Sequence, residues 1–254
     1  MCLIIFSCNV HPEYSLILAA NRDEFYDRPT APLGFWTDEP SVLGGRDLLG
    51  GGSWLGATRD LKIAAITNYR DPSSLNPDAP SRGELVQQFL CGKASPSAHM
   101  SHVEKNGGDY NGFNLLIGHK DKFWLHSNRG RGAKELAPGF YGLSNHLLDT
   151  PWPKVKKSKA ALQGMFTSGE IDTDAIFQTL ADGSFPPVAE LPDTGVEPLW
   201  ERILSPIFIS SHGYGTRSSS IILVGKNGNL RFLEREFFVK KDGAFGQMTR
   251  EFNL

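Results

Sequence analysis

Short apolar runs bounded by turn residues constrain the fold of this 254-residue chain most strongly. Runs of this length, ended by Gly, Asn, Asp or Pro, are typical of β-strands. Strands are predicted at residues 3–7, 15–20, 61–68, 114–119, 122–126, 219–224 and 230–238. Asn227 and Gly228 separate the last two runs, and this pair favours a tight hairpin, so these strands are predicted to be antiparallel.

Helical patterns are fewer and lie in the middle of the chain. One helix is predicted after Ser81, with Ser81 as its N-cap, Glu84 at the capping-box position and Gly92 at its end. Two more are predicted over residues 152–166 and 173–183. Strands at both ends with helices between them predict one α+β layered domain over the whole chain rather than a parallel βαβ array.

Composition excludes several classes of partner. The net charge is −2, and no stretch gathers Lys and Arg beyond the short run at 154–159, so nucleic acid and anionic membranes are poor candidates. No run approaches the roughly 18 apolar residues of a membrane span. The three cysteines show no paired spacing, which predicts a reducing compartment and a cytoplasmic protein.

Two patterns in the sequence could suggest a phosphate-binding loop or a metal site, but neither has the residue spacing that such a site needs. The glycine-rich segment at 44–56 lacks the spacing of a phosphate-binding loop, so it is predicted to form tight turns or to let backbone approach a ligand. His146 and His212 have no His or acidic neighbour at metal-ligand spacing. We therefore predict neither a metal nor a cofactor.

Cys2 stands directly before the first predicted strand. Methionine aminopeptidases remove Met1 when the next side chain is as small as cysteine. The new N-terminal residue would then carry both a thiol and a free α-amine, so a nucleophile and its base would share one residue.

Polar residues also mark the ends of other predicted strands. They are the segment 21–24 (Asn-Arg-Asp-Glu), Asn68, Asn145 and Arg217. Each has an ordinary structural explanation as well: a charged hairpin tip for 21–24, a helix-cap region for Asn145 and an exposed edge residue for Arg217. Each is weak evidence alone.

The order of these segments is similar to that of the NRDE family, also called the Transport and Golgi organisation 2 family. The matching segments are MC at the start, LILAANRDEF, GGSWLGAT, AAITNY, RGELV, YNGFNLL, YGLSN, TPW and YGTRSS, and they span essentially the full length. The family in turn resembles the N-terminal nucleophile hydrolases near choloylglycine hydrolase and penicillin V acylase. The resemblance implies an αββα sandwich of two antiparallel sheets between helical layers.

The resemblance also implies roles for the polar residues. Cys2 matches the nucleophile, with its α-amine as base, and Asn145 matches a side-chain donor to the oxyanion. Arg217 matches an arginine that lowers the pKa of the thiol. Asn68 is expected to add a backbone donor.

Arg22 and Asp23 match an arginine that supports the thiol and a carboxylate that holds the α-amine. Here the sequence departs from the hydrolase pattern, because these two residues are adjacent rather than separated. Either Asp23 or Glu24 therefore fits the carboxylate role. All the polar clusters are expected to converge around Cys2 at one end of the stacked sheets.

Two functions remain open. One is a cysteine amidohydrolase that acts on a linear amide or acyl compound. The other is a non-enzymatic carrier, because members of the resembled family are linked to haem trafficking and to lipid homeostasis, and the same fold can serve either purpose. Aromatic residues around Trp36, Trp54 and Trp200 line an apolar pocket in either case or pack in the core, which is the commoner use of any one of them.

Overall fold

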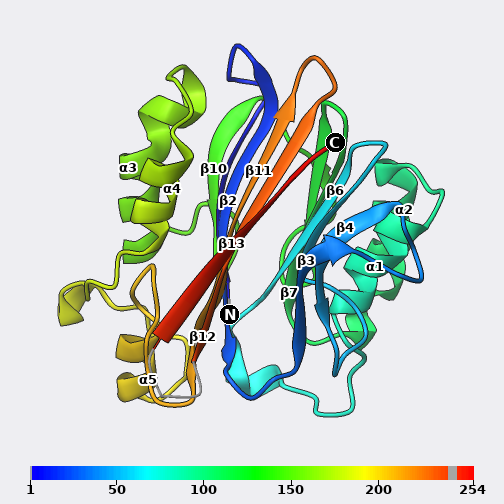
Figure 1. The fold of residues 1–254 in the computed structure, drawn as a ribbon. Coiled ribbons are helices and arrows are strands. Elements are labelled where there is room, and N and C mark those ends of the chain that lie inside the picture. Colours follow the sequence, from blue (N-terminus) through cyan, green and yellow to red (C-terminus); the bar gives the residue numbers. More distant parts are fainter. Residues whose placement is uncertain (1, 240–244) are drawn as a thin grey trace. The chain divides into compact units, whose positions relative to one another are not determined.

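The computed structural model describes residues 2–239 and 245–254. These residues divide into two compact units, which we describe separately. The first unit takes its residues from Met1–Asp27, Pro138–Ser144 and Leu148–Leu254, and the second from Arg28–Ala137 and Asn145–Leu147. Figure 1 colours the elements in chain order.

The first unit is built on an antiparallel sheet of six strands in the order β10-β1-β2-β11-β12-β13. Its long central pair, β2 and β11, carries most of the residues predicted for the site. The strand bounds are β1 Cys2–Cys8, β2 Tyr14–Phe25, β10 Gly139–Leu143, β11 Tyr214–Gly225, β12 Leu230–Val239 and β13 Phe245–Asn253.

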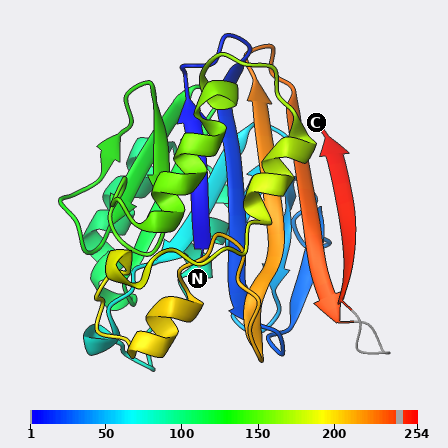
Figure 2. The same cartoon turned by 90° about the vertical axis from the view of Figure 1, so that its left-hand side faces the viewer.

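Helices cover one face of this sheet. Figure 2 shows α3 (Pro153–Thr167) and α4 (Thr173–Leu180) lying along it. Side chains alternate along a strand, so every second residue of β1, β2 and β11 points to the helices. These residues form the core with α3 and α4: Leu3, Ile5, Ile17, Ala19, Ile221 and Leu223 pack with Val155, Leu162, Phe166, Ile176 and Phe177. The short helices η3 (Val188–Glu190) and α5 (Pro198–Ile203) follow α4.

The second unit is built on an antiparallel sheet of seven strands in chain order, β3 to β9. Each strand of this sheet therefore pairs with the strands that come before and after it in the chain. The bounds are β3 Thr30–Phe35, β4 Val42–Asp47, β5 Leu55–Thr58, β6 Lys62–Asn68, β7 Phe113–His119, β8 Lys122–Ser127 and β9 Lys134–Glu135.

Two helices, α1 (Gly83–Cys91) and α2 (Pro96–Asn106), pack on this second sheet, and the short helices η1 (Pro72–Ser74) and η2 (Gly107–Asp109) lie in its connections. Its core joins residues of β6 and β7 to the buried faces of α1 and α2: Ala64, Ile66, Leu115 and Ile117 with Leu85, Val86, Phe89, Leu90, Met100 and Val103.

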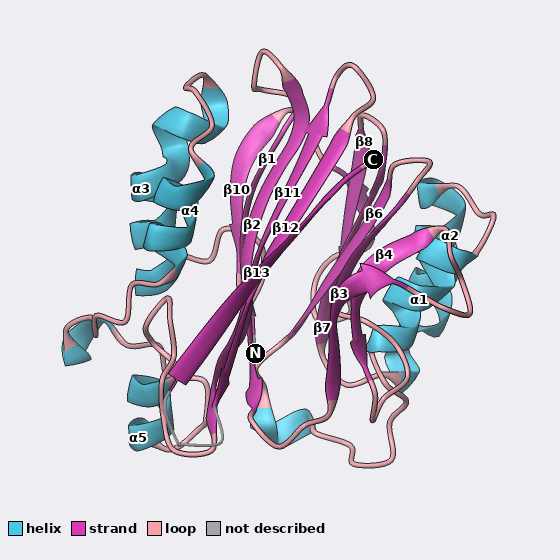
Figure 3. Ribbon diagram, viewed as in Figure 1, coloured by secondary structure: helices cyan, strands magenta, loops and turns pink. Residues whose placement is uncertain are grey.

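All seven strands predicted from the sequence are present, and the α+β class with antiparallel sheets is confirmed (Figure 3). The three predicted helices are also present, as α1, α3 and α4. The glycine-rich segment forms the turn between β4 and β5, as predicted, and Gly51 there has a φ of 78°. Within the described part of the chain, no helix is long and apolar enough to cross a membrane.

The predicted cap of the first helix was wrong. The N-cap of α1 is Arg82, with no side-chain cap hydrogen bond, rather than Ser81. The backbone N–H of Glu84 donates to the carbonyl of Ser81 at 3.1 Å, so the chain already turns just before the helix begins at Gly83. The proline-rich segment 184–200 contains η3 and the start of α5.

Candidate active site

Cys2 and Arg22 are paired residues of neighbouring strands. The antiparallel register of β1 and β2 sets Cys2 opposite Arg22 and Leu3 opposite Asn21. Leu3 belongs to the core beneath the helices, so the alternation of side chains turns those of Cys2 and Arg22 to the opposite face of this sheet. The sheet register therefore brings the predicted nucleophile and its predicted supporting arginine together.

Asn21 has a structural role. Its Nδ2 donates to the carbonyls of Leu180 and Ile207, both at 2.8 Å, and its Oδ1 accepts from Ser219 Oγ at 2.6 Å. Leu180 is the last residue of α4, whose final carbonyls have no partner within the helix. Asn21 thus ties β2 to the end of α4 and to the segment after α5.

Asp23 is a buried carboxylate, with 1% of its surface exposed. Thr216 Oγ1 donates to its Oδ1 at 2.7 Å, and the Tyr214 hydroxyl donates to its backbone carbonyl at 3.1 Å. Burial raises the pKa of Asp23, while the charges of Lys154 and Arg22 and the bond from Thr216 oppose this rise. The carboxylate therefore depends on nearby cations to stay ionised.

Arg217 lies at an irregularity of β11. The pairing with β2 shifts register between Thr216 and Ser218, as at a β-bulge, and such shifts redirect side chains. Its Nη1 donates to the carbonyl of Phe25 at 2.8 Å. Burial and the like charge of Arg22 lower the pKa of Arg217, so two guanidinium groups act on each other here.

The thiol of Cys2 is half-buried, and this burial raises its pKa. Asp23 adds to the rise more strongly than Glu24 does, and Arg22 opposes it. The sequence predicts that Arg217 lowers this pKa, and that role stays a prediction, because burial gives the largest effect on the thiol. Glu24 forms an ion pair with Arg22, with 3.8 Å between Glu24 Oε2 and Arg22 Nη2.

Asn68 and Asn145 lie together in the second unit. Asn145 Nδ2 donates to the backbone carbonyl of Asn68 at 3.1 Å and to its Oδ1 at 2.9 Å. The carbonyl of Asn145 accepts from the N–H of Arg70 at 2.7 Å. The alternative role of Asn145 as a helix cap does not hold, because the N-cap of α3 is Trp152.

Sequence reasoning missed three residues around the first group. Ser144 Oγ donates to the carbonyl of Cys2 at 3.0 Å, Thr216 binds Asp23, and Lys154 acts on the charge of Asp23. Ser144 and Thr216 each precede a predicted site residue directly, so their position was a usable signal. Lys154 gave no such signal, because a lysine in a Lys-rich helix is usually exposed.

Two of the three tryptophans take the alternative role of core packing. Trp36 and Trp54 pack in the core of the second unit, where Trp36 Nε1 donates to the carbonyl of Gly44 at 3.2 Å. Trp200 belongs to the first unit and packs edge-on against Tyr214 at 6.0 Å between ring centroids. His146 stacks against Tyr69 at 4.8 Å. No group of three or more potential metal ligands occurs among the residues that the structure describes.

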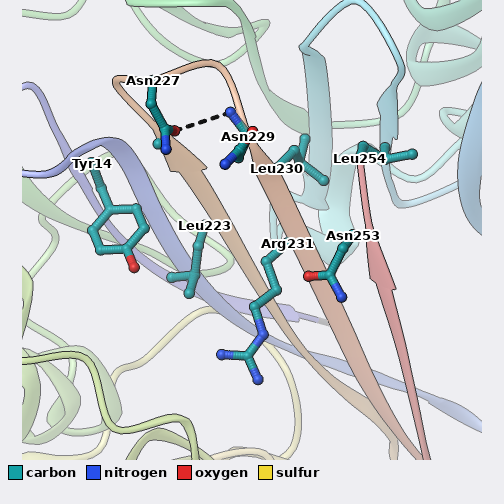
Figure 4. A pocket seen from close by; sticks show the side chains of 9 residues that line it. Tyr14, Leu223, Asn227, Asn229, Leu230, Arg231, Asn253 and Leu254 are labelled. Atoms are coloured by element: carbon teal, nitrogen blue, oxygen red, sulfur yellow. Dashed lines mark hydrogen bonds between the residues drawn. The ribbon is translucent and has the colours of Figure 1, made fainter.

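One cavity of about 450 Å³ opens on the first sheet, lined by Tyr14, Arg231 and Asn253 among others (Figure 4). Tyr14 begins β2 whereas Asp23 lies near its end. At about 3.3 Å per residue, this separation along the strand is roughly 30 Å. The cavity is therefore distinct from the group around Cys2.

The fold is that of the N-terminal nucleophile hydrolases. The chain is similar to the N-acylethanolamine-hydrolyzing acid amidase ortholog of Caenorhabditis elegans, with a TM-score of 0.51 over 88% of this chain and 92% of that one. Sequence identity is 9%, so this likeness shows the fold alone.

The chain belongs to the Transport and Golgi organisation 2 family, whose family model matches residues 1–238. It is 38% identical to the Transport and Golgi organization protein 2 homolog of Bos taurus, over all of this chain and 99% of that protein. Its identity to the Homo sapiens homolog is 37%, with the same coverage. The family predicted from the sequence motifs is thus confirmed.

Proposed function

We propose that this protein is an N-terminal-nucleophile cysteine amidohydrolase that acts on a linear amide or acyl compound. The observation that carries the proposal is the pairing of Cys2 with Arg22, next to the buried carboxylate of Asp23. A buried carboxylate beside an N-terminal strand suits the role of holding an α-amine. The proposal requires removal of Met1, which lies outside the described residues.

In the proposed reaction, the α-amine of Cys2 takes the thiol proton as sulfur attacks the carbonyl carbon of the substrate. Asn145 donates to the oxyanion that forms. The protonated amine then gives its proton to the leaving nitrogen as the C–N bond breaks, which leaves a thioester on Cys2. Water attacks this thioester with the amine again as base, and the carboxylic acid and the free thiol are released.

The raised pKa of the thiol fits this sequence of proton transfers. Since burial favours the neutral thiol, the proton leaves during the attack rather than before it. An α-amine with an ordinary pKa of about 8 is a suitable acceptor near neutral pH. Ser144 Oγ donates to the carbonyl of Cys2, so the residue directly before Asn145 in the chain contacts the proposed nucleophile.

A carrier of haem or an acyl lipid is the second candidate. The observation in its favour is the same burial of the thiol, because a carrier needs no activated nucleophile. A carrier also has no use for a free α-amine on Cys2.

An intact-mass experiment separates the two functions. Natively expressed protein is weighed before and after treatment with a chloromethyl or acyl thiol probe, and then assayed with a panel of amides and thioesters. We expect loss of Met1, a single addition at Cys2, and turnover that Cys2→Ala abolishes. Cys8 is fully buried and serves as an internal control for labelling.

Retention of Met1 would refute the hydrolase. Absence of hydrolysis across the panel, with micromolar or tighter haem binding that survives Cys2→Ala, would establish the carrier instead.

A further inference from the structure

Lys154 is a buried cation in the first turn of α3. It follows Pro153 at the start of the helix, and 3% of its surface is exposed. Two effects make a cation unfavourable at this position. The N-terminus of a helix carries partial positive charge, and an ammonium group loses its hydration when it is buried. The first turn of α3 contains no acidic residue to offset either effect.

The ammonium of Lys154 donates to the carbonyl of Leu204 at 3.1 Å. A carbonyl oxygen satisfies one hydrogen of the ammonium but carries no full negative charge, so this bond does not neutralise the cation. A carboxylate in the same layer of the first unit would do so.

Asp23 is that carboxylate. It stands two residues after Asn21, whose side chain reaches the carbonyls of Leu180 and Ile207 on the helix-covered face of the sheet. Alternation along β2 puts Asp23 on the same face, where 1% of its surface is exposed. Of the charged side chains near Asp23, Lys154 has the largest influence on its pKa, which it lowers.

We propose that Lys154 is a positioning residue, which keeps Asp23 ionised and oriented to hold the α-amine of Cys2. The part of this inference that concerns the α-amine rests on the proposed function. The ion pair between Lys154 and Asp23 does not, and it can be tested without any substrate.

Other groups also influence the charge of Asp23 or are influenced by it. Arg22, from its own strand, favours its ionised form, and Thr216 donates to it from β11. Asp23 in turn raises the pKa of the Cys2 thiol and of the Tyr26 hydroxyl. Arg22 turns to the other face of the sheet, so Lys154 is the cation that approaches from the helix layer.

Glu201 is the buried carboxylate of α5 in this part of the unit. It accepts from the backbone N–H of Thr194 at 2.9 Å and from its hydroxyl. These bonds fix Glu201 to the loop before α5, and the effect of Lys154→Met on the titration of Asp23 in the test below distinguishes the two carboxylates.

The first test measures the ionisation of Asp23 directly. Protein labelled with ¹³C at the aspartate carboxyl groups is titrated by NMR, with Asp23→Asn used to assign the resonance. We expect Lys154→Met to raise the titration midpoint of Asp23 by about one pH unit or more, since an opposite charge shifts a carboxyl pKa by that amount. Lys154→Arg should restore it.

Lys156→Met is the matched control. Lys156 lies on the same helix, its side chain is 59% exposed, and its nearest acidic partner is Glu190 at 3.9 Å. Its replacement should leave the midpoint of Asp23 unchanged. An unchanged midpoint in Lys154→Met would overturn the proposal.

A double-mutant cycle on unfolding tests the same pair when a single variant folds poorly. If Lys154 and Asp23 compensate each other, Lys154→Met combined with Asp23→Asn should be more stable than the sum of the two single effects predicts. Strictly additive effects would refute the ion pair.

Turnover adds a third readout once a substrate is known. The acid limb of the kcat/KM profile should move to higher pH in Lys154→Met and return in Lys154→Arg. If Lys154→Met shifts the titration midpoint of Asp23 as expected but the protein turns over no substrate, the ion pair stands and the result counts against the hydrolase. Turnover with an unshifted acid limb in Lys154→Met would count against the positioning role.

Discussion

The side-chain amide of Asn145 donates to both oxygens of Asn68, to the backbone carbonyl at 3.1 Å and to Oδ1 at 2.9 Å. Asn145 is fully buried, and its own carbonyl accepts from the N–H of Arg70. The amide is thus held in one orientation. The Nδ2 of an amide has two hydrogens, and both of these bonds go to Asn68, so in the proposed role an oxyanion would replace one oxygen of Asn68 as the acceptor.

Replacing Asn145 tests this role. Asn145→Ala should slow turnover by roughly 100- to 1,000-fold and change KM little, because the lost bond forms only with the developing charge. Asn68→Ala is the comparison, since it removes one of the two acceptors and keeps the backbone carbonyl that orients Asn145. The fall in kcat caused by Asn68→Ala should be smaller than the fall caused by Asn145→Ala. Steady-state kinetics of both variants check the prediction, and a change confined to KM would contradict it.

The reactivity of Cys2 should depend on Arg22 more than on Arg217. Arg22 lowers the pKa of the thiol against the effect of burial, and its loss would also remove a cation that pairs with Glu24. Arg22→Gln should therefore raise the pH midpoint for alkylation of Cys2. Arg217→Gln should change it less, because Arg217 is fixed to the carbonyl of Phe25. Iodoacetamide rates measured from pH 6 to 10 compare the two variants, and a larger shift in Arg217→Gln would refute the assignment.

The sequence predicted the strands that carry a continuous apolar or alternating pattern and missed those that lack it. The apolar runs at 3–7 and 219–224 form central strands, so their side chains carry the pattern of the core. The strand β13 is an edge strand with the polar sequence FGQMTREFN, and β4 contains two glycines, so neither has the usual strand pattern. The helix α2 was missed because it buries only His99, Met100 and Val103.

The site could be predicted in part. Motif order led to Cys2, Arg22, Asp23 and Arg217, and the register of β1, β2 and β11 brings these four together. The sign of the thiol pKa could not be predicted, because burial depends on packing that no motif reports. Lys154 was missed for a similar reason, since only the structure distinguishes it from the exposed lysines of the same helix.

Asn21 should contribute to stability rather than to chemistry. Asn21→Ala would leave the carbonyls of Leu180 and Ile207 and the hydroxyl of Ser219 without this partner inside the protein. Buried polar groups left unsatisfied cost about 1–3 kcal/mol each, so we expect a loss of roughly 3 kcal/mol. Chemical denaturation measures it, with Asn229→Ala at the exposed β11–β12 turn as the control, expected within about 0.5 kcal/mol of wild type. Equal losses in both variants would contradict the role of Asn21.

The histidine of α2 predicts a pH dependence of stability. Burial lowers the pKa of His99 from 6.5 to about 4, and its ring packs against Phe89 at 5.3 Å between centroids. Below pH 6.5 the unfolded chain therefore binds a proton that the folded chain does not, so stability is lost as the pH falls from 6.5 towards 4. One such group accounts for up to about 3 kcal/mol, since each pKa unit is worth about 1.4 kcal/mol.

Urea denaturation at several pH values between 4 and 7 checks this dependence. His99→Leu should make the free energy of unfolding less dependent on pH, because the group that takes up the proton on unfolding is gone. His102→Leu, at an exposed position of the same helix, should keep the wild-type dependence. A slope that is the same in wild type and His99→Leu would show that His99 is not the group responsible, and that its burial costs the folded state little on protonation.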